Sequence, residues 1–534
     1  MSSSDPRLGP NTVLTTTRDE AVAKLMMGTT EGAYKLGSLD EESLGKIIKA
    51  RAFGSKQEKE WPGELVNMVG EVAKRCAGSP LAATALGSLL GTKTSKEEWK
   101  DVLNGSTICD EENGILPVLK LSYNCLPSYM RQCFAFCAMF PKDYEIDVQT
   151  LIHLWMANGF IPEQSKVCPE TFGETIFIEL KSRSFFQDLK NVPFDENKYS
   201  IDGEGDKHMY CSRITCKIHD LMHDVAQSAM GEECAAIATH SSEKEDVLRS
   251  ARHLYLSISR PETLLDASQE KGSPAFQTLI CDGDVEEDMK ILSKYNSIRA
   301  LKIVCYSILR PKYLHHLRYL DLSESFLQAL PEDISILYHL QTLNLSYCEW
   351  LERLPKQLKY LTGLGHLYTH GCGKLKSMPP ELGRLTSLQT LTYFVAGADG
   401  SGCSNLGELQ NLDLGGTLKL SKLENVTGAD AQADAEAAGL RKKKKLTELE
   451  LCWTDSDQEA QNNNHKEVVE GLKPHDELKA LRINHCGSRT FPTWMNTLKG
   501  MVNLKLFHCK KLEELPALWE RENLTSAVFR TNCC

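Results

Sequence analysis

The sequence has no long apolar run and no surplus of positive charge. Among its 534 residues, 72 are acidic and 61 are basic, so the formal net charge is −11. General binding to nucleic acid or to acidic lipid needs a basic surface that displaces counterions, and this balance argues against both. Residues 1–10 are polar without the apolar core of a signal peptide, and nowhere do about 18 apolar residues follow one another as a membrane-spanning helix requires. We therefore predict a cytoplasmic or nucleo-cytoplasmic protein with no membrane span.

A disulfide framework and a zinc-binding spacing are also missing. The 19 cysteines are scattered and odd in number, which is typical of reduced thiols in the cytosol. Cys133 and Cys137 lie one helical turn apart without a second pair at zinc spacing, so core packing is the better interpretation. His219 and His223 stand at i and i+4, but Asp220 occupies the place where a zinc protease has its Glu base. A metalloprotease is the minor alternative, and we expect no metal and no catalytic residue.

A leucine pattern with a period of 23 or 24 residues dominates the second half. L-x-x-L-x-L begins at Leu317 and Leu340 and continues in degraded form at Leu364 and Leu388. In L-x-L both leucines point into one core, and stacked strands of this kind form a curved parallel sheet. A second register keeps a 24-residue step at Leu330-Pro331, Leu354-Pro355 and Met378-Pro379, and again at Phe491-Pro492 and Leu515-Pro516. Two registers with one period predict a leucine-rich-repeat solenoid.

The outward positions of these strands would line a concave face suited to a broad protein surface, although each alone is better explained as a solvated residue. The phase is lost between Tyr393 and Leu446, where residues 428–439 are rich in alanine and helical in character. The basic run from Arg441 to Lys445 suits a solvated helix end better than nuclear targeting. No polar capping unit precedes the last residue, which predicts a truncated solenoid. The outward positions include Arg318, Tyr319, Asp321, Gln341, Asn344, His366, Tyr368, Arg482 and Asn484.

The first half contains helices that begin and end at recognisable residues. Residues 13–17 predict a strand, with Arg18 at its carboxyl end and a helix through Met27. Such a place suits a phosphate-binding Arg, although a surface Arg is the default. An apolar stripe over 65–76 predicts one helix, and Ser79 caps another that starts at Pro80 and continues through Leu90.

Further along, the pattern changes to short helices followed by a hairpin. Apolar helices are expected over 133–144, halted by Pro141, and over 151–161, closing at Gly159. Polar residues 190–215 suit a hairpin, and a helix follows near 220–230. This order is typical of a winged helix-turn-helix, for which the acidic charge disfavours a DNA-binding role.

Taken together, ordered segments of the chain resemble plant disease-resistance proteins of the NB-ARC leucine-rich-repeat type, coiled-coil subclass. The matching segments are Leu14 to Arg18, similar to a threonine-rich strand with a sensor Arg; Gly78 to Ala82, similar to GLPLA with Ser79 in place of Leu; Leu121-Ser122-Tyr123 with Leu126-Pro127; Cys133 to Tyr144; and Ile218-His219-Asp220, similar to MHD with Ile in place of Met.

The resemblance implies a switch in which ADP holds a closed state and exchange for ATP opens it. Arg18 would sense the phosphates, Pro80 would pack near the adenine with Leu81 in the same motif, and His219 would reach the β-phosphate. Family members detect pathogen effectors or guarded host proteins through their repeats, then oligomerise and trigger plant defence with cell death. The implied fold is multidomain α+β.

The chain departs from the family in lacking the Walker A loop, the acidic Walker B strand and the N-terminal coiled coil. A phosphate cradle and its Mg²⁺ need those groups, so we expect an N-terminally truncated receptor that does not hydrolyse ATP. The alternatives are a working ADP-binding switch, if the Walker A region exists upstream, or a non-signalling decoy or decayed fragment; oligomerisation stays open. The expected domains are a remnant of the α/β nucleotide-binding domain over 1–30, a helical ARC1-type domain over 31–110, a winged-helix ARC2-type domain over 111–235 and an α/β leucine-rich-repeat solenoid over 250–534.

Overall fold

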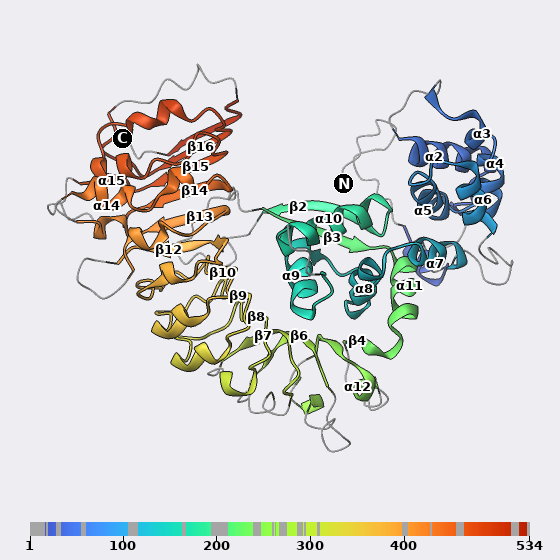
Figure 1. The fold of residues 1–534 in the computed structure, drawn as a ribbon, viewed down its shortest axis with the longest axis horizontal. Helices are drawn as coiled ribbons and strands as arrows, with labels where there is room; N and C mark the ends of the chain where they lie inside the picture. The colour runs from blue at the N-terminus through green and yellow to red at the C-terminus, as the bar shows by residue number, and fades with distance from the viewer. Residues whose placement is uncertain are drawn as a thin grey trace. The chain divides into compact units, whose positions relative to one another are not determined.

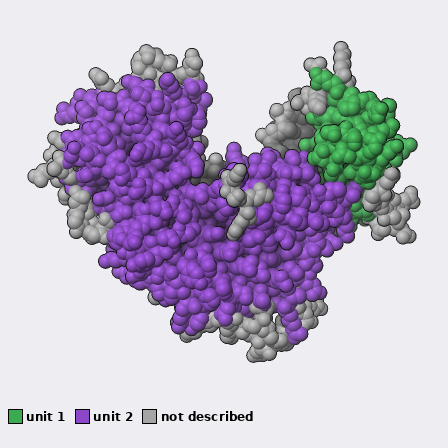
Figure 2. Space-filling model, in the orientation of Figure 1, with its two compact units in different colours: residues 1–118 green, residues 119–534 purple. Residues whose placement is uncertain are grey.

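The structure is a computed structural model of the 534-residue chain. It divides into two compact units, residues 1–118 and residues 119–534 (Figure 2), which are treated separately below. The described residues are 16–17, 20–27, 34–54, 60–104, 116–162, 167–193, 212–238, 247–258, 261, 263–265, 275–285, 292, 295–306, 310–397, 404–427, 430–454, 464–513 and 523–530.

The first unit is helical throughout its described part. The predicted helices ending at Met27 and at Leu90 are confirmed as α1 and α5. The stripe over 65–76 is two helices rather than one, because Asn67 and Met68 form a short turn with right-handed backbone angles that keeps the stripe facing inward. The helices are α1 (Glu20–Met27), α2 (Glu41–Phe53), α3 (Gly63–Val66), α4 (Val69–Arg75), α5 (Pro80–Leu90) and α6 (Lys96–Asn104), with α7 (Leu116–Asn124) at the boundary of the units.

The second unit begins with the winged helix. Three antiparallel strands in the order β1-β3-β2 form its wing, and the residues between β2 and β3 lie outside the described part. The predicted end at Gly159 is confirmed, since this residue caps α9 with a φ of 76°. The elements are α8 (Ser128–Phe136), the 3-10 turn η2 (Cys137–Met139), β1 (Ile146–Asp147), α9 (Val148–Asn158), α10 (Pro169–Ser182), β2 (Phe186–Pro193), β3 (Ser212–Ile218), α11 (Asp220–Met230) and the 3-10 turn η4 (Gly231–Glu233).

Two parallel sheets make up the predicted solenoid (Figure 1). One has eight strands in the order β11 to β4, and the other has six in the order β12 to β17. The strands are β4 (Cys234–Ile237), β5 (His253–Leu256), β6 (Thr278–Val285), β7 (Ala300–Cys305), β8 (Tyr319–Asp321), β9 (Thr342–Asn344), β10 (His366–Tyr368), β11 (Thr390–Leu391), β12 (Tyr393–Val395), β13 (Gly416–Ser421), β14 (Leu446–Cys452), β15 (Ala480–Asn484), β16 (Asn503–Phe507) and β17 (Ser526–Arg530).

Short helical segments connect these strands. They are α12 (Val247–Ser250), η7 (Pro311–Tyr313), η8 (Glu332–Ile336), η9 (Lys356–Tyr360), η10 (Leu382–Arg384), η11 (Leu406–Leu409), η12 (Leu423–Asn425), α14 (Ala431–Glu436), η13 (Leu440–Lys442), α15 (His465–Gly471) and η14 (Thr493–Thr497).

One expectation about the repeats needs correction. The parallel sheet begins at β4, ahead of residue 250, because a strand with small residues can join the sheet without carrying the leucine pattern. In agreement with the predicted solenoid over 250–534, the stack continues through the stretch after Tyr393, where β12 pairs with β13 and β13 with β14. Longer turns between these strands, one of them containing α14, hide the period without interrupting the stack.

Neighbouring repeats are joined by side chains as well as by strand pairing. Leu320, Leu343 and Leu367 occupy matching positions and are fully buried. The thiol of Cys348 donates to the carbonyl of Leu322 in the preceding repeat at 3.1 Å.

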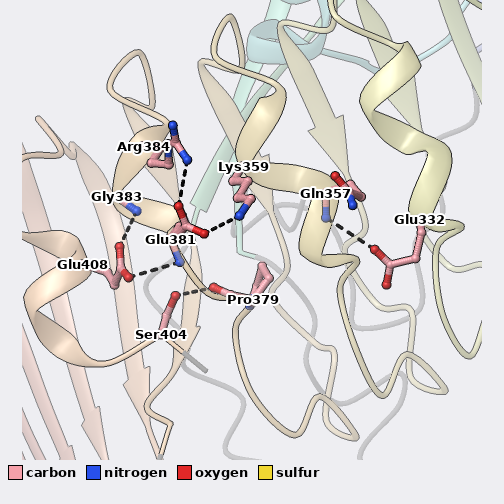
Figure 3. A network of polar contacts seen from close by, with 9 residues as sticks. All are labelled: Glu332, Gln357, Lys359, Pro379, Glu381, Gly383, Arg384, Ser404 and Glu408. Carbon is pink, nitrogen blue, oxygen red and sulfur yellow. Dashed lines mark hydrogen bonds and ion pairs between the residues drawn. The ribbon is translucent and has the colours of Figure 1, made fainter. Parts of the chain in front are cut away.

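Farther along, the Glu408 carboxylate accepts the backbone N–H groups of Glu381 at 3.1 Å and Gly383 at 2.8 Å (Figure 3). Each repeat thus satisfies polar groups of the repeat before it.

Within the described residues, no helix is long and apolar enough to cross a membrane.

Candidate functional site

The four nucleotide-site residues implied by the resemblance fall in different parts of the structure. Arg18 lies outside the described residues. Pro80 and Leu81 open α5 in the first unit, and His219 precedes α11 in the second.

The turn before Pro80 is held by backbone constraints. Gly78 has a φ of +77°, and a Cβ there would lie 2.3 Å from the Cβ of Ser38. Ser79 caps α5 by accepting the N–H of Ala82 at 3.4 Å. Pro80 can then occupy the first helical turn, where no N–H is needed, and its ring is exposed. The motif is consequently a rigid turn that presents an apolar ring.

His219 is the N-cap of α11, with its Nδ1 accepting the N–H of Leu221 at 3.2 Å. In the neutral ring this bond places the proton on Nε2, which becomes a hydrogen-bond donor. A donor of this kind suits a phosphate oxygen. The side chain is partly exposed, whereas the next histidine on this segment is not.

The zinc-protease alternative does not agree with this geometry. His223 is buried, and its Nε2 lies 2.7 Å from the carbonyl oxygen of Phe140, to which only a protonated nitrogen can donate. His219 has non-helical backbone angles, so the two rings do not share a helix face. No cluster of three metal-binding side chains is found in the described ranges.

The concave face of the repeats was predicted to be open for a partner, and much of it is instead covered by the chain's own winged helix. Helices α9 and α10 lie on the concave side of the eight-stranded sheet (Figure 1). Tyr319, Asp321 and His366, predicted as partner-facing, are buried. The leucine pattern indicates which side chains point away from the core, but it does not indicate which other part of the chain covers them.

Asn158 at the end of α9 provides one polar anchor of this contact. Its Nδ2 lies 3.0 Å from Thr278 Oγ1 on β6 and 2.9 Å from the Leu154 carbonyl. The Arg299 guanidinium donates to the Asn158 carbonyl at 3.1 Å, where a cation complements the negative end of the helix dipole.

Asp282 on β6 provides a second anchor. Its carboxylate accepts from Lys302 at 3.0 Å, from the Tyr144 hydroxyl at 3.5 Å and from Tyr255. Burial and the neighbouring carboxylate raise the pKa of the Tyr255 hydroxyl, which keeps it protonated as a donor.

A third anchor joins α10 to β10. Glu170 Oε1 lies 3.2 Å from His366 Nε2, and Thr390 Oγ1 lies 3.0 Å from His366 Nδ1. Burial alone raises the pKa of Glu170, but hydrogen bonds from His366 and Cys168 outweigh it and hold this pKa at about 2. Glu170 is therefore ionised and its partners act as donors.

The concave side chains of the six-stranded sheet form a separate cluster centred on Glu450. Its carboxylate is 3.0 Å from Lys419 Nζ, 2.8 Å from Asn484 Nδ2 and 3.9 Å from the Arg482 guanidinium. Burial raises the pKa of Glu450, yet the two cations outweigh it and lower this pKa overall. Arg482 also lies over the Phe507 ring, 4.7 Å from its centroid. We call these five side chains the Glu450 cluster.

Lys443, in the basic run predicted to be solvated, is buried. Its Nζ donates to the carbonyls of Leu409 and Leu412, both at 2.7 Å. Burial lowers its pKa to about 8, and the flanking Lys442 acts in the same direction against Asp413. No sequence signal distinguishes this lysine from its neighbours, because the pattern does not show which side chain turns inward.

Two family models match the chain. Residues 139–226 match the disease resistance protein winged helix domain, and residues 406–531 match the R13L1/DRL21 leucine-rich repeats. Both agree with the folds seen in those segments.

Relatives extend the match to nearly the whole chain. A putative disease resistance protein RGA1 of Solanum bulbocastanum is 35% identical over 97% of this chain and 48% of its own length. Putative disease resistance RPP13-like protein 1 of Arabidopsis thaliana is 35% identical over 95% of this chain and 47% of its own. The chain thus spans about half the length of the curated relatives it matches.

Among solved structures, an internalin of Listeria monocytogenes overlaps 53% of this chain and 88% of its own at 17% identity, with a TM-score of 0.35, too low to carry an argument. The winged-helix match, the repeat match and 35% identity over most of the chain agree, and the chain is a homologue of plant disease-resistance proteins.

Proposed function

We propose that this chain works in an intracellular plant immune receptor whose repeats bind a protein, either a pathogen effector or a guarded host protein. Its homology to plant disease-resistance proteins and its solenoid support this role. The described cysteines are free thiols, which suits a reducing compartment. The relatives are called disease resistance proteins, and the step from that name to recognition by this chain is the proposal.

The observation that carries the proposal is the division of the concave face. Hydrogen bonds and ring contacts of the winged helix, within the described ranges, end on β4 to β10 or beside these strands, and on Gln389 beside β11. The Glu450 cluster lies beyond that zone, with Glu450 and Phe507 buried and the Lys419 and Arg482 side chains partly exposed. Arginine beside an aromatic ring, with charges arranged around it, is a composition typical of residues that dominate protein interfaces. We therefore place the partner on β13 to β16.

The test is a binding screen of the full chain against pathogen effectors and plant proteins, followed by two matched variants. Arg482→Ala removes a cluster cation, whereas Arg489→Ala removes an exposed cation outside the sheet that pairs with Glu513. We expect Arg482→Ala to weaken binding by roughly tenfold or more, the scale of an interface hot spot, and Arg489→Ala to leave it unchanged. A repeat region that binds no protein, or equal losses in both variants, would contradict the proposal.

Nucleotide binding is a second proposal, supported by the rigid turn at Pro80 and by the donor at His219 Nε2. We infer that Arg18, Pro80, Leu81 and His219 contribute to an ADP or ATP site. The purified chain should then retain ADP, detectable by chromatography of its denatured extract, and should lose it on Arg18→Ala or His219→Ala.

The exposed His316, in the repeats, provides the control His316→Ala, which should retain the nucleotide. If no nucleotide co-purifies and none raises the melting temperature, this chain is a non-signalling decoy or a decayed fragment rather than a switch. We also infer that it does not hydrolyse ATP, since the sequence contains no Walker A loop. Phosphate release above that of a heat-denatured sample would overturn this inference.

A further inference from the structure

Two histidines are buried in the contact between the winged helix and the repeats. His153 projects from α9 and is 3% exposed, while His253 projects from β5 and is 2% exposed. Each ring packs against the opposite partner: His153 against His366, and His253 against Phe136 and Phe160. Each imidazole is thus covered in part by rings of the opposite partner.

The surroundings of His153 provide little support for a positive charge. The centroid of the His366 ring is 4.2 Å from that of His153, and that of the Tyr368 ring is 6.1 Å away. Glu170 is the nearby carboxylate, but it is already bonded to His366 at 3.2 Å. Nε2 of His153 has no hydrogen-bond partner within the described part of the chain.

The other elements packed on α9 bring charges that are already paired. On β6 and β7, Asp282 pairs with Lys302 at 3.0 Å. On β8, Asp321 accepts from the Tyr319 hydroxyl at 3.0 Å. At the start of α9, Asp147 accepts the N–H of Thr150 at 2.7 Å.

His253 is surrounded by rings, a hydroxyl and cations. Its Nδ1 lies 3.0 Å from Thr278 Oγ1, and the Phe136 ring meets it edge-on with centroids 4.9 Å apart. Arg252 and Arg299 are the charged groups that act on it. A positive charge on the His253 ring would be repelled by both guanidinium groups.

The titration directions agree with this geometry. Burial, with the neighbouring His366 adding to it, lowers the pKa of His153 well below its usual value. Burial, reinforced by Arg252 and Arg299, lowers the pKa of His253 to about 4. Both rings are neutral in the docked form.

We propose that the winged helix is held on the repeat sheet by a proton-sensitive latch, closed while His153 and His253 are neutral and released as they take up protons. The undocked form exposes both rings to water, where a histidine titrates near pH ~6.5. Below that value the undocked form binds more protons than the docked form, so docking weakens as the pH falls. This concerns a contact within the chain and does not depend on any partner.

Hydrogen exchange of the full chain tests the latch, with labelling times scaled so that the intrinsic exchange rate is matched at each pH. Between pH 7.5 and 5.5 the protection of α9 should fall by up to about tenfold per pH unit for each histidine below pH ~6.5. Strands β14 to β16, outside the contact, should keep their protection. Constant protection of α9, or an equal loss in β14 to β16, would overturn the proposal.

Variants locate the effect on the two rings. The double variant His153→Gln with His253→Gln cannot take up these protons, so the pH dependence of α9 should disappear. The control His370→Gln removes a histidine whose pKa is also lowered, to about 4 by burial, but whose ring contacts Tyr347 and Ser346 within the repeats. It should retain the pH dependence. If the double variant does not fold, the pH series on the unmodified chain still tests whether the protection of α9 falls with pH.

Discussion

At the scale of single residues, Lys443 shows how a polar side chain can be structural. Its ammonium reaches two carbonyls from the turn between η11 and β13, Leu409 and Leu412. Lys443 turns inward to reach these carbonyls, while Lys445 pairs with Asp413 at the surface at 2.7 Å. Neighbours in one basic run thus have opposite environments, which explains why the interpretation as a solvated end failed at this residue.

Lys443→Met should change the dependence of stability on pH. The pKa of Lys443 is about 8 in the fold, and a free lysine titrates near ~10.4, so between these values the unfolded chain binds more protons. The unfolding free energy of the native chain should therefore rise relative to the variant across this window, by at most about 1.4 kcal/mol per pH unit. Urea unfolding of both proteins at pH 8 and pH 10 measures this difference in unfolding free energy. A difference that is the same at both pH values would contradict the lowered pKa of Lys443.

At the scale of elements, the repeats are joined by a carboxylate that caps the preceding turn. Glu381 has a φ of +61° at the start of η10, which directs its N–H and that of Gly383 toward Glu408 (Figure 3). The Glu381 carboxylate in turn pairs with Arg384 at 2.8 Å and with Lys359 of the preceding repeat. A chain of such contacts makes each turn depend on its neighbours.

Removal of this cap should loosen η10. Glu408→Ala leaves two backbone N–H groups without an acceptor, at a cost of roughly 1–3 kcal/mol in local opening free energy. The matched control Glu332→Ala removes only one contact of 3.4 Å, to Gln357 N, and should cost less than about 0.5 kcal/mol. Hydrogen exchange of η10 measures the effect of both substitutions. Equal effects would contradict the role of Glu408 as the cap of this turn.

A backbone variant tests the same contact from the other side. A Cβ at Gly383 would lie 2.7 Å from the Glu408 carbonyl oxygen, so Gly383→Ala should also speed exchange at η10. At Gly373 a Cβ meets nothing within 4 Å, and Gly373→Ala should be tolerated.

At the scale of the second unit, the winged helix and the solenoid form one packed body. Asn158 lies at the centre of their contact, bonded to Thr278 and 4% exposed. Helix α9 contacts β6, β7 and β8, and α10 contacts β10. Our proposal places a partner on the second sheet, beyond the printed hydrogen bonds and ring contacts of the winged helix.

Asn158→Ala should weaken docking without unfolding either part. It leaves the fully buried Thr278 with one partner fewer, and about 1–3 kcal/mol of docking free energy should be lost. Exchange in α9 reports the change. Asn344→Ala is the control, because this side chain accepts the N–H of Ser346 within the repeats at 3.0 Å. Faster exchange in the control alone would contradict the importance of Asn158.

Local signals account for what could be predicted. Ser79 and Pro80 begin α5, Gly159 ends α9, and the leucines of β8 to β10 are buried, each as predicted. The helix ends depend on residues adjacent in the sequence, and the buried leucines depend on the repeat period. Of the candidate nucleotide site, the sequence predicted which residues stand in the matching motifs, and their joint action stays a prediction.

The sequence by itself determined the repeat core, the helix ends and the family, because periodicity, capping and motif order are properties of residues close together in the chain. Only the tertiary structure decided which outward residues are covered, that Lys443 turns inward, and that His153 meets His366. Those outcomes depend on pairs far apart in the sequence, such as Glu170 and His366. When one surface is buried against another, the contact produces no periodic pattern and no fixed residue spacing in the sequence.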